Sequence, residues 1–258
     1  AELPFDTNTL DATGIEGALV AFFGQGFDVT SDVPIRVALF EVSTDDHVLA
    51  MVAHHISADG FSMRPMVRDV MTAYSARVHG EAPAWPPLEI QYADFGLWQR
   101  DVLGSPEDPS SVISTQISYW MEQLAGGPEQ LSLPFDSSRP RTPSTEGARV
   151  EFTVGTTVAR QVAETARSTS ATTFMVVHSA LAVLLARLSG SSDIVIGTPV
   201  AGRGERQLDD VIGMFVNTLV LRTQVREDET FVDLVALAKE TDLAAFGHAD
   251  VPFEMLVD

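Results

Sequence analysis

Two adjacent histidines follow an apolar segment in the stretch HHISADG, residues 54–60. The preceding run, His47 to Ala53, is apolar after its first residue, which is typical of a buried β-strand. Successive strand side chains point to opposite faces, so we expect His54 and His55 to lie in different surroundings. This argues against one metal ion bound by both and favours one imidazole facing a cavity as an acid/base group. An isolated histidine pair is more often a purely structural, hydrogen-bonded pair, so further motifs must decide.

Other familiar catalytic motifs are absent from the sequence. It contains no GxxxxGK[ST] phosphate loop, no GxGxxG dinucleotide fingerprint and no GxSxG nucleophile elbow. The remaining histidines are scattered, and His178, within an apolar helical stretch, is predicted to be a core histidine with its hydrogen bonds satisfied. A single histidine site without a nucleophilic Ser or Cys suits direct transfer between two bound substrates.

Composition excludes several classes of protein. A length of 258 residues is compatible with two lobes or one large domain, and a hydrophobic content of 45% is enough for a sizeable core. There is no Cys, so disulfides, thiolate nucleophiles and zinc–thiolate sites are excluded. A net charge of -20 argues against nucleic acid as a partner. With no apolar run long enough to span a membrane, we expect an acidic globular protein of the cytoplasm.

The order of predicted elements is mixed, which indicates an α+β (mixed α/β) fold with two lobes. In the first part we expect a helix at 12–24, strands at 35–42 and 47–53 joined by a tight turn at 44–46, and helices at 61–78, 92–103 and 111–124. After a segment rich in Gly, Pro and Ser we expect strands at 148–153, 194–199 and 214–225 and helices at 156–169, 172–189 and 230–247.

Several motifs together resemble one family. HHISADGFS resembles the HHxxxDG core of the condensation domains of nonribosomal peptide synthetases, in the chloramphenicol-acetyltransferase-like superfamily. Three more segments are similar to motifs of this family in its order: YADFGLW (92–98), IGMFVNTLVLR (212–222) and HADVPFE (248–254). The stretch IVIGTPVAGR (194–203) is also similar, so the resemblance covers essentially the whole chain.

This resemblance implies a chloramphenicol-acetyltransferase-like two-lobed sandwich that is incomplete at both ends. Residues 1–130 correspond to the C-terminal part of the N-lobe, 131–146 to a linker and 147–258 to the first part of the C-lobe. The family's SxAQxRLW-like, RHExLRT-like and RxxxxNPL-like segments are not in the sequence. We therefore expect an internal fragment that is inactive in isolation and self-associates.

The resemblance also implies an acyltransferase-type reaction that forms a peptide bond. An acyl or peptidyl thioester on an upstream carrier domain is joined to the amine of an aminoacyl thioester on a downstream one. Both substrates are bound as thioesters to phosphopantetheine arms, and an adenylation domain is expected next to the chain. No directly bound cofactor, no metal, no nucleic acid and no membrane partner is expected.

Roles for the HHxxxDG residues follow from the same resemblance. His55 matches the catalytic histidine, either as a base or as a group that positions the amine. Gly60 matches the position whose backbone N–H approaches the oxyanion, where a side chain would obstruct. His54 is expected to support the loop, and Asp59 to hold it through an arginine. In the family this arginine comes from the RHExLRT-like segment, which the sequence lacks, so Arg36 is suggested as a substitute.

The remaining motif residues carry more than one interpretation. Ser62 and Asn217 are candidates for the substrate tunnel, although the Asn217 amide could equally satisfy neighbouring backbone. Tyr92, together with Asp94 and Trp98, recurs at helical spacing, for which packing is the expected role. Arg203, in a Gly-rich turn, is predicted to anchor an ion pair.

Other functions remain open at this point. Epimerization domains share HHxxxDG, but IGMFVNTLVLR is condensation-like, and Met63 stands where those domains usually have Trp. Heterocyclization domains carry DxxxxD instead and are excluded. A stand-alone acyltransferase of the superfamily and a non-catalytic recruitment domain remain as alternatives.

Overall fold

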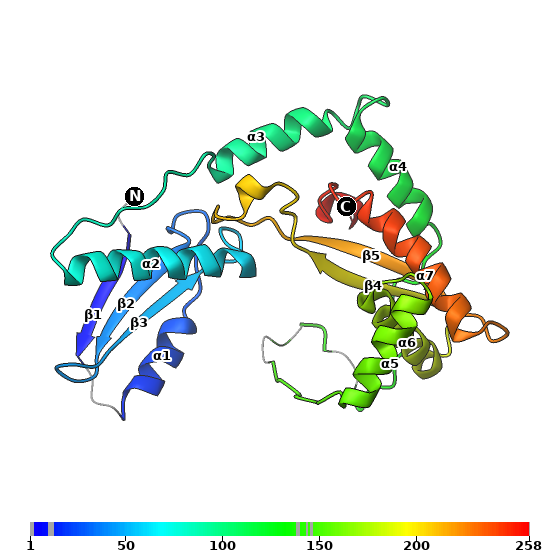
Figure 1. The fold of residues 1–258 in the computed structure, drawn as a ribbon, viewed down its shortest axis with the longest axis horizontal. Coiled ribbons are helices and arrows are strands. Elements are labelled where there is room, and N and C mark those ends of the chain that lie inside the picture. Colours follow the sequence, from blue (N-terminus) through cyan, green and yellow to red (C-terminus); the bar gives the residue numbers. More distant parts are fainter. Residues whose placement is uncertain (1–2, 10–12, 138–139, 143, 145–146, 258) are drawn as a thin grey trace. The chain divides into compact units, whose positions relative to one another are not determined.

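The computed structural model describes residues 3–9, 13–137, 140–142, 144 and 147–257. The chain divides into two compact units (Figure 1). Unit 1 comprises Ala1–Gln99 and Ala201–Val216, and unit 2 comprises Arg100–Val200 and Asn217–Asp258. The lobe boundary expected at 131–146 stays a prediction, and residues 138, 139, 143, 145 and 146 of that linker lie outside the described residues.

Unit 1 contains a three-stranded sheet with the order β1-β2-β3, in which β1 pairs with β2 in parallel and β2 with β3 antiparallel. Its elements are β1 (Phe5–Thr9), α1 (Ile15–Phe23), β2 (Ile35–Glu41), β3 (His47–Ala53), the 3-10 helix η1 (Gly60–Ser62), α2 (Met63–Val78), the larger part of α3 (Tyr92–Leu103) and the 3-10 helix η2 (Arg206–Leu208). The predicted strands, turn and helices of this part are confirmed to within a few residues. Strand β1 was not predicted, because its sequence FDTNT lacks an apolar alternation.

The core of unit 1 lies between the β2–β3 hairpin and α1. Ala38 pairs with Ala50, and Phe40 pairs with Val48, so alternate residues of both strands share one face. Phe22 of α1 packs against this face. Strand β3 is less buried than predicted: it lies at one edge of this sheet, and only Ala50 of its seven residues is buried.

Unit 2 combines the antiparallel strand pair β4–β5 with helices. Its elements are the end of α3, α4 (Val112–Leu124), α5 (Thr156–Ser168), α6 (Thr173–Ser189), β4 (Asp193–Val200), β5 (Asn217–Gln224), α7 (Phe231–Phe246) and α8 (Glu254–Val257). Trp120 packs in its core with Leu219, Leu221 and Val251. Among the described residues no single helix has the length and apolarity to cross a membrane, and α5 and α6 meet both criteria only as a pair bent by 108°.

One predicted strand of this part is wrong. Residues 148–153 alternate apolar and polar side chains, but they form no strand in the structure. Val150 and Phe152 are 86% and 83% exposed. A strand needs a neighbour for its backbone hydrogen bonds, and no described segment pairs with this one.

Candidate active site

The histidine loop, residues 54–62, leaves the end of β3. The His54 N–H donates to the Pro34 carbonyl at 2.9 Å, and the His54 Nδ1 accepts from the Ile56 N–H at 3.1 Å. The half-buried His54 ring also meets the Phe27 ring edge to face at 5.9 Å. His55 is exposed, and its imidazole has no hydrogen-bond partner among the described residues. The two histidines thus lie in different surroundings, as the strand alternation predicts.

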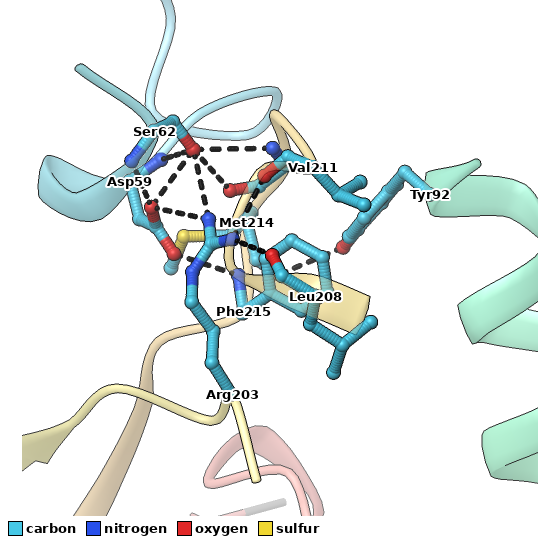
Figure 2. A network of polar contacts seen from close by, with 9 residues as sticks. Asp59, Ser62, Tyr92, Arg203, Leu208, Val211, Met214 and Phe215 are labelled. Atoms are coloured by element: carbon cyan, nitrogen blue, oxygen red, sulfur yellow. Dashed lines mark hydrogen bonds and ion pairs between the residues drawn. The ribbon is translucent and has the colours of Figure 1, made fainter. Parts of the chain in front are cut away.

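Asp59 is the centre of a buried network of polar contacts (Figure 2). It is 3% exposed and caps η1, accepting hydrogen bonds from the Ser62 N–H at 2.9 Å and the Ser62 hydroxyl at 2.8 Å. Its other oxygen accepts from the Phe215 N–H at 3.1 Å. Arg203 completes the set with an ion pair at 3.0 Å. Asp59 therefore ties the histidine loop to residues 201–216.

Arg203 is the cationic partner of Asp59, which confirms its predicted role as an ion-pair anchor. Its side chain is only 5% exposed, and its guanidinium donates to the carbonyls of Leu208 and Val211 and lies 4.1 Å from the centre of the Phe215 ring. The suggestion of Arg36 was wrong. The Arg36 guanidinium on β2 instead donates to the carbonyls of Gln25 and Gly26, which follow α1.

Electrostatics keep Asp59 ionised. Burial by itself would raise its pKa. Hydrogen bonds from Ser62, the Phe215 N–H and Arg203 outweigh the burial, so the pKa of Asp59 is lowered. A charged carboxylate at this position is what the ion pair with Arg203 requires.

Ser62 is fully buried and its hydroxyl is engaged on several sides. Besides Asp59, the oxygen lies 2.9 Å from the Gly213 carbonyl and accepts from the Gly213 N–H at 3.1 Å and from Arg203 at 3.1 Å. These contacts join the start of α2 to residues 201–216. A tunnel role for Ser62 stays a prediction.

Gly60 lies at the exposed start of η1. Its N–H donates to no acceptor in the described part of the chain, as is usual for the first N–H groups of a helix. A Cβ built on Gly60 would meet no atom within 4 Å. An oxygen of a ligand could therefore approach this N–H. The catalytic role of Gly60 stays a prediction.

Asn217 lies at the first position of β5, in unit 2. Its Nδ2 donates to the carbonyls of Ala249 and Val251 at 2.8 and 2.7 Å, and its Oδ1 accepts from the Phe253 N–H at 3.1 Å. The amide thus forms hydrogen bonds with backbone groups of the HADVPFE segment, which is one of the two roles considered for Asn217. Its role in a substrate tunnel stays a prediction.

The arrangement at the loop can support proton exchange and oxyanion binding. The His55 imidazole is accessible and uncommitted, while a buried ion pair fixes the loop behind it. Among the described residues, no group of three or more His, Asp or Glu side chains could hold a metal ion. Sequence reasoning missed the contacts of Gly213 and Phe215 with this loop, although the IGMFVNT motif contains both.

Comparisons with known proteins give the family. The Condensation domain profile matches residues 5–258. The chain is 44% identical over 232 residues to a dimodular nonribosomal peptide synthase of Bacillus subtilis, covering 90% of the chain and 10% of that protein. It is 44% identical over 253 residues to an isonitrile lipopeptide synthase of Mycobacterium tuberculosis, covering 98% of the chain and 10% of that protein. The chain thus spans about a tenth of the length of these relatives.

Solved structures agree with this match. The X-domain from teicoplanin biosynthesis is 35% identical, with a TM-score of 0.91 over 99% of this chain and 57% of that one. A four-domain nonribosomal peptide synthetase bound to AMP and glycine is 26% identical, with a TM-score of 0.81 over 100% of this chain and 19% of that one. These likenesses confirm the predicted mixed α/β fold, and with the profile match they show that the chain belongs to the condensation domain family of nonribosomal peptide synthetases.

Proposed function

We propose that this chain is part of a domain that forms a peptide bond between two carrier-bound substrates. The observation that carries the proposal is an exposed, uncommitted His55 on a loop that the buried Asp59–Arg203 pair holds in place. In this reaction the acceptor amine attacks the donor thioester carbon and the C–N bond forms. The C–S bond then breaks, and the proton lost by the nitrogen goes to the leaving thiolate.

The motif residues of the histidine loop have proposed roles in this reaction. His55 takes the amine proton or orients the amine, because a neutral imidazole offers one nitrogen that accepts a proton and one N–H that donates. The Gly60 N–H donates to the oxyanion of the tetrahedral intermediate. His54 and Asp59 keep the loop in position, and Ser62 and Asn217 remain candidates for the tunnel.

The proposed partners are the domains that bring the substrates. They are upstream and downstream carrier domains with phosphopantetheine arms and an adjacent adenylation domain, all in the cytoplasm. We propose that residues 1–130 and 147–258 belong to the two lobes of a larger domain. The chain by itself then lacks part of the catalytic machinery.

The experiment supplies the complete domain with an aminoacyl donor and an aminoacyl acceptor, each loaded on its carrier protein. Mass spectrometry of the acceptor carrier follows the product. We expect a dipeptidyl thioester on the phosphopantetheine arm of the acceptor carrier and a free thiol on that of the donor carrier. Donor hydrolysis alone would contradict the proposal. Inversion of the donor stereocentre without transfer would also contradict it and would point to an epimerization domain.

A second candidate is a recruitment domain without catalysis. It is favoured by the complex of the X-domain with OxyB, whose X-domain has a TM-score of 0.92 and 35% identity to this chain. This alternative expects no product from the loaded carriers together with saturable binding of a partner protein. Product formation that depends on His55 would exclude it.

A further inference from the structure

Tyr92, at the start of α3, contacts residues 213–215 with both its ring and its hydroxyl. The hydroxyl donates to the Met214 carbonyl at 2.7 Å (Figure 2). The ring meets the Phe215 ring edge to face at 5.1 Å and 85°. Burial raises the pKa of Tyr92, and the charge of Asp59 raises it further, so the hydroxyl keeps the proton that it donates.

Gly213 is the position that allows this close approach. A Cβ at residue 213 would lie 2.2 Å from the Tyr92 Cδ2, 2.7 Å from the Tyr92 Cε2 and 2.9 Å from the Phe215 Cε2. Such distances are far below van der Waals contact, so any side chain at 213 would displace one of the two rings. The ring of Tyr92 therefore depends on the absence of a side chain at Gly213.

The same three residues contact the histidine loop. The Asp59 N–H donates to the Gly213 carbonyl at 3.1 Å, and the Phe215 N–H donates to the Asp59 carboxylate at 3.1 Å. The Ser62 hydroxyl contacts both the carbonyl and the N–H of Gly213. Residues 213–215 thus connect Tyr92 to the loop that carries His55 and Gly60.

We propose that Tyr92 and Gly213 are positioning residues for the reaction at His55. Tyr92 fixes the backbone of residues 213–215, and this backbone fixes Asp59 and hence the histidine loop. The effect on turnover rests on the proposed function, whereas the effect on the loop can be measured without it. Neither residue is expected to touch the substrates.

Hydrogen exchange in the complete domain tests the link between Tyr92 and the loop. Tyr92→Phe removes only the hydroxyl, so the amides of Asp59 and Phe215 should exchange about threefold to tenfold faster, as for the loss of one hydrogen bond. The β2–β3 amides should be unchanged. Tyr74→Phe is the matched control, because Tyr74 is 65% exposed on α2. Unchanged exchange at Asp59 and Phe215 would overturn the proposal.

Steady-state kinetics test whether the link matters for the reaction. Tyr92→Phe should lower kcat by about threefold to tenfold with KM for both loaded carriers within twofold, because displacement of a catalytic group costs rate and leaves remote binding intact. Gly213→Ala should cost more, and Tyr92→Ala should relieve part of that loss in the double variant. Faster exchange with an unchanged kcat, or strictly additive losses, would overturn the positioning role while leaving the proposed function intact. Absence of peptide from the wild-type domain would instead contradict the proposed function.

Discussion

The carboxylate of Asp59 and the guanidinium of Arg203 are both buried, so each depends on the other for its counter-charge. Removing one partner of a buried pair leaves an uncompensated charge, which costs roughly 3–5 kcal/mol. We therefore expect Asp59→Ala to lower the free energy of unfolding by about this amount in denaturant titrations. Asp69→Ala is the control, because its ion pair with Arg68 is exposed and such pairs contribute less than about 1 kcal/mol. An Asp59→Ala variant that is as stable as wild type yet inactive would place Asp59 in the chemistry.

The lowered pKa of Asp59 also predicts a pH dependence. A carboxylate whose pKa is lower in the folded state adds stability above its ordinary value of 3.8, and this stability is lost as the pH falls through the folded-state pKa. Unfolding midpoints of wild type should therefore drop more steeply below about pH 4 than those of Asp59→Asn. Parallel curves for the two proteins would show that Asp59 is not held ionised by the network.

For individual residues, the sequence was enough to identify the candidate site. It was less informative about which residues contact one another there. A strand followed by HHISADG was enough to place His54 and His55 in different surroundings. It could not show that Arg203 pairs with Asp59, because 144 residues separate them in the chain. Nothing in the sequence around Gly213 indicates that Tyr92 lies close to it, because the two residues meet only when distant segments of the chain pack together.

At the scale of elements, three secondary-structure elements of unit 2 meet at a buried polar cluster. His178 of α6 lies 3.0 Å from the Asp242 carboxylate of α7, and its other nitrogen is 3.4 Å from the Thr223 hydroxyl of β5. This confirms His178 as a core histidine with its hydrogen bonds satisfied. His178→Ala leaves the buried Asp242 carboxyl without this hydrogen-bond partner and should destabilise unit 2 by roughly 1–3 kcal/mol in denaturant titrations. His79→Ala, at an exposed position after α2, is the control. Equal stability of the two variants would contradict this account of the cluster.

Most helices and the β2–β3 hairpin could be predicted because their signals are local. Apolar periodicity and capping residues such as Thr172 and Thr230 mark α6 and α7. Strand formation at 148–153 could not be decided locally, because a strand exists only when a neighbour accepts and donates its hydrogen bonds. The polar β1 was missed for the same reason. It pairs with β2, which follows it in the sequence only after α1.

For the whole molecule, the exposed apolar surface of α6 predicts self-association. Five apolar residues recur at heptad spacing on this helix and are 40% to 53% exposed: Phe174, Val177, Leu181, Leu184 and Leu188. Such a stripe favours burial against another chain. We expect the isolated 258-residue chain to form dimers or larger species in light scattering and to make no peptide from loaded carriers. Leu181→Glu with Leu184→Glu should lower the apparent mass. A monomeric wild-type chain that makes peptide would show that it needs no further segments.

The proposed chemistry depends on His55 and not on its neighbour His54. The most direct measurement is the single-turnover rate of peptide formation by the complete domain with His55→Ala and, in parallel, with His54→Ala. Loss of a positioned proton-transfer group typically costs ~10²–10⁴ in rate, so His55→Ala should lower the rate of peptide formation by at least this factor. The free energy of unfolding and the affinity for the carriers should be unchanged. His54→Ala, which loses only loop contacts, should retain far more activity. Near-normal peptide formation by His55→Ala would contradict the account.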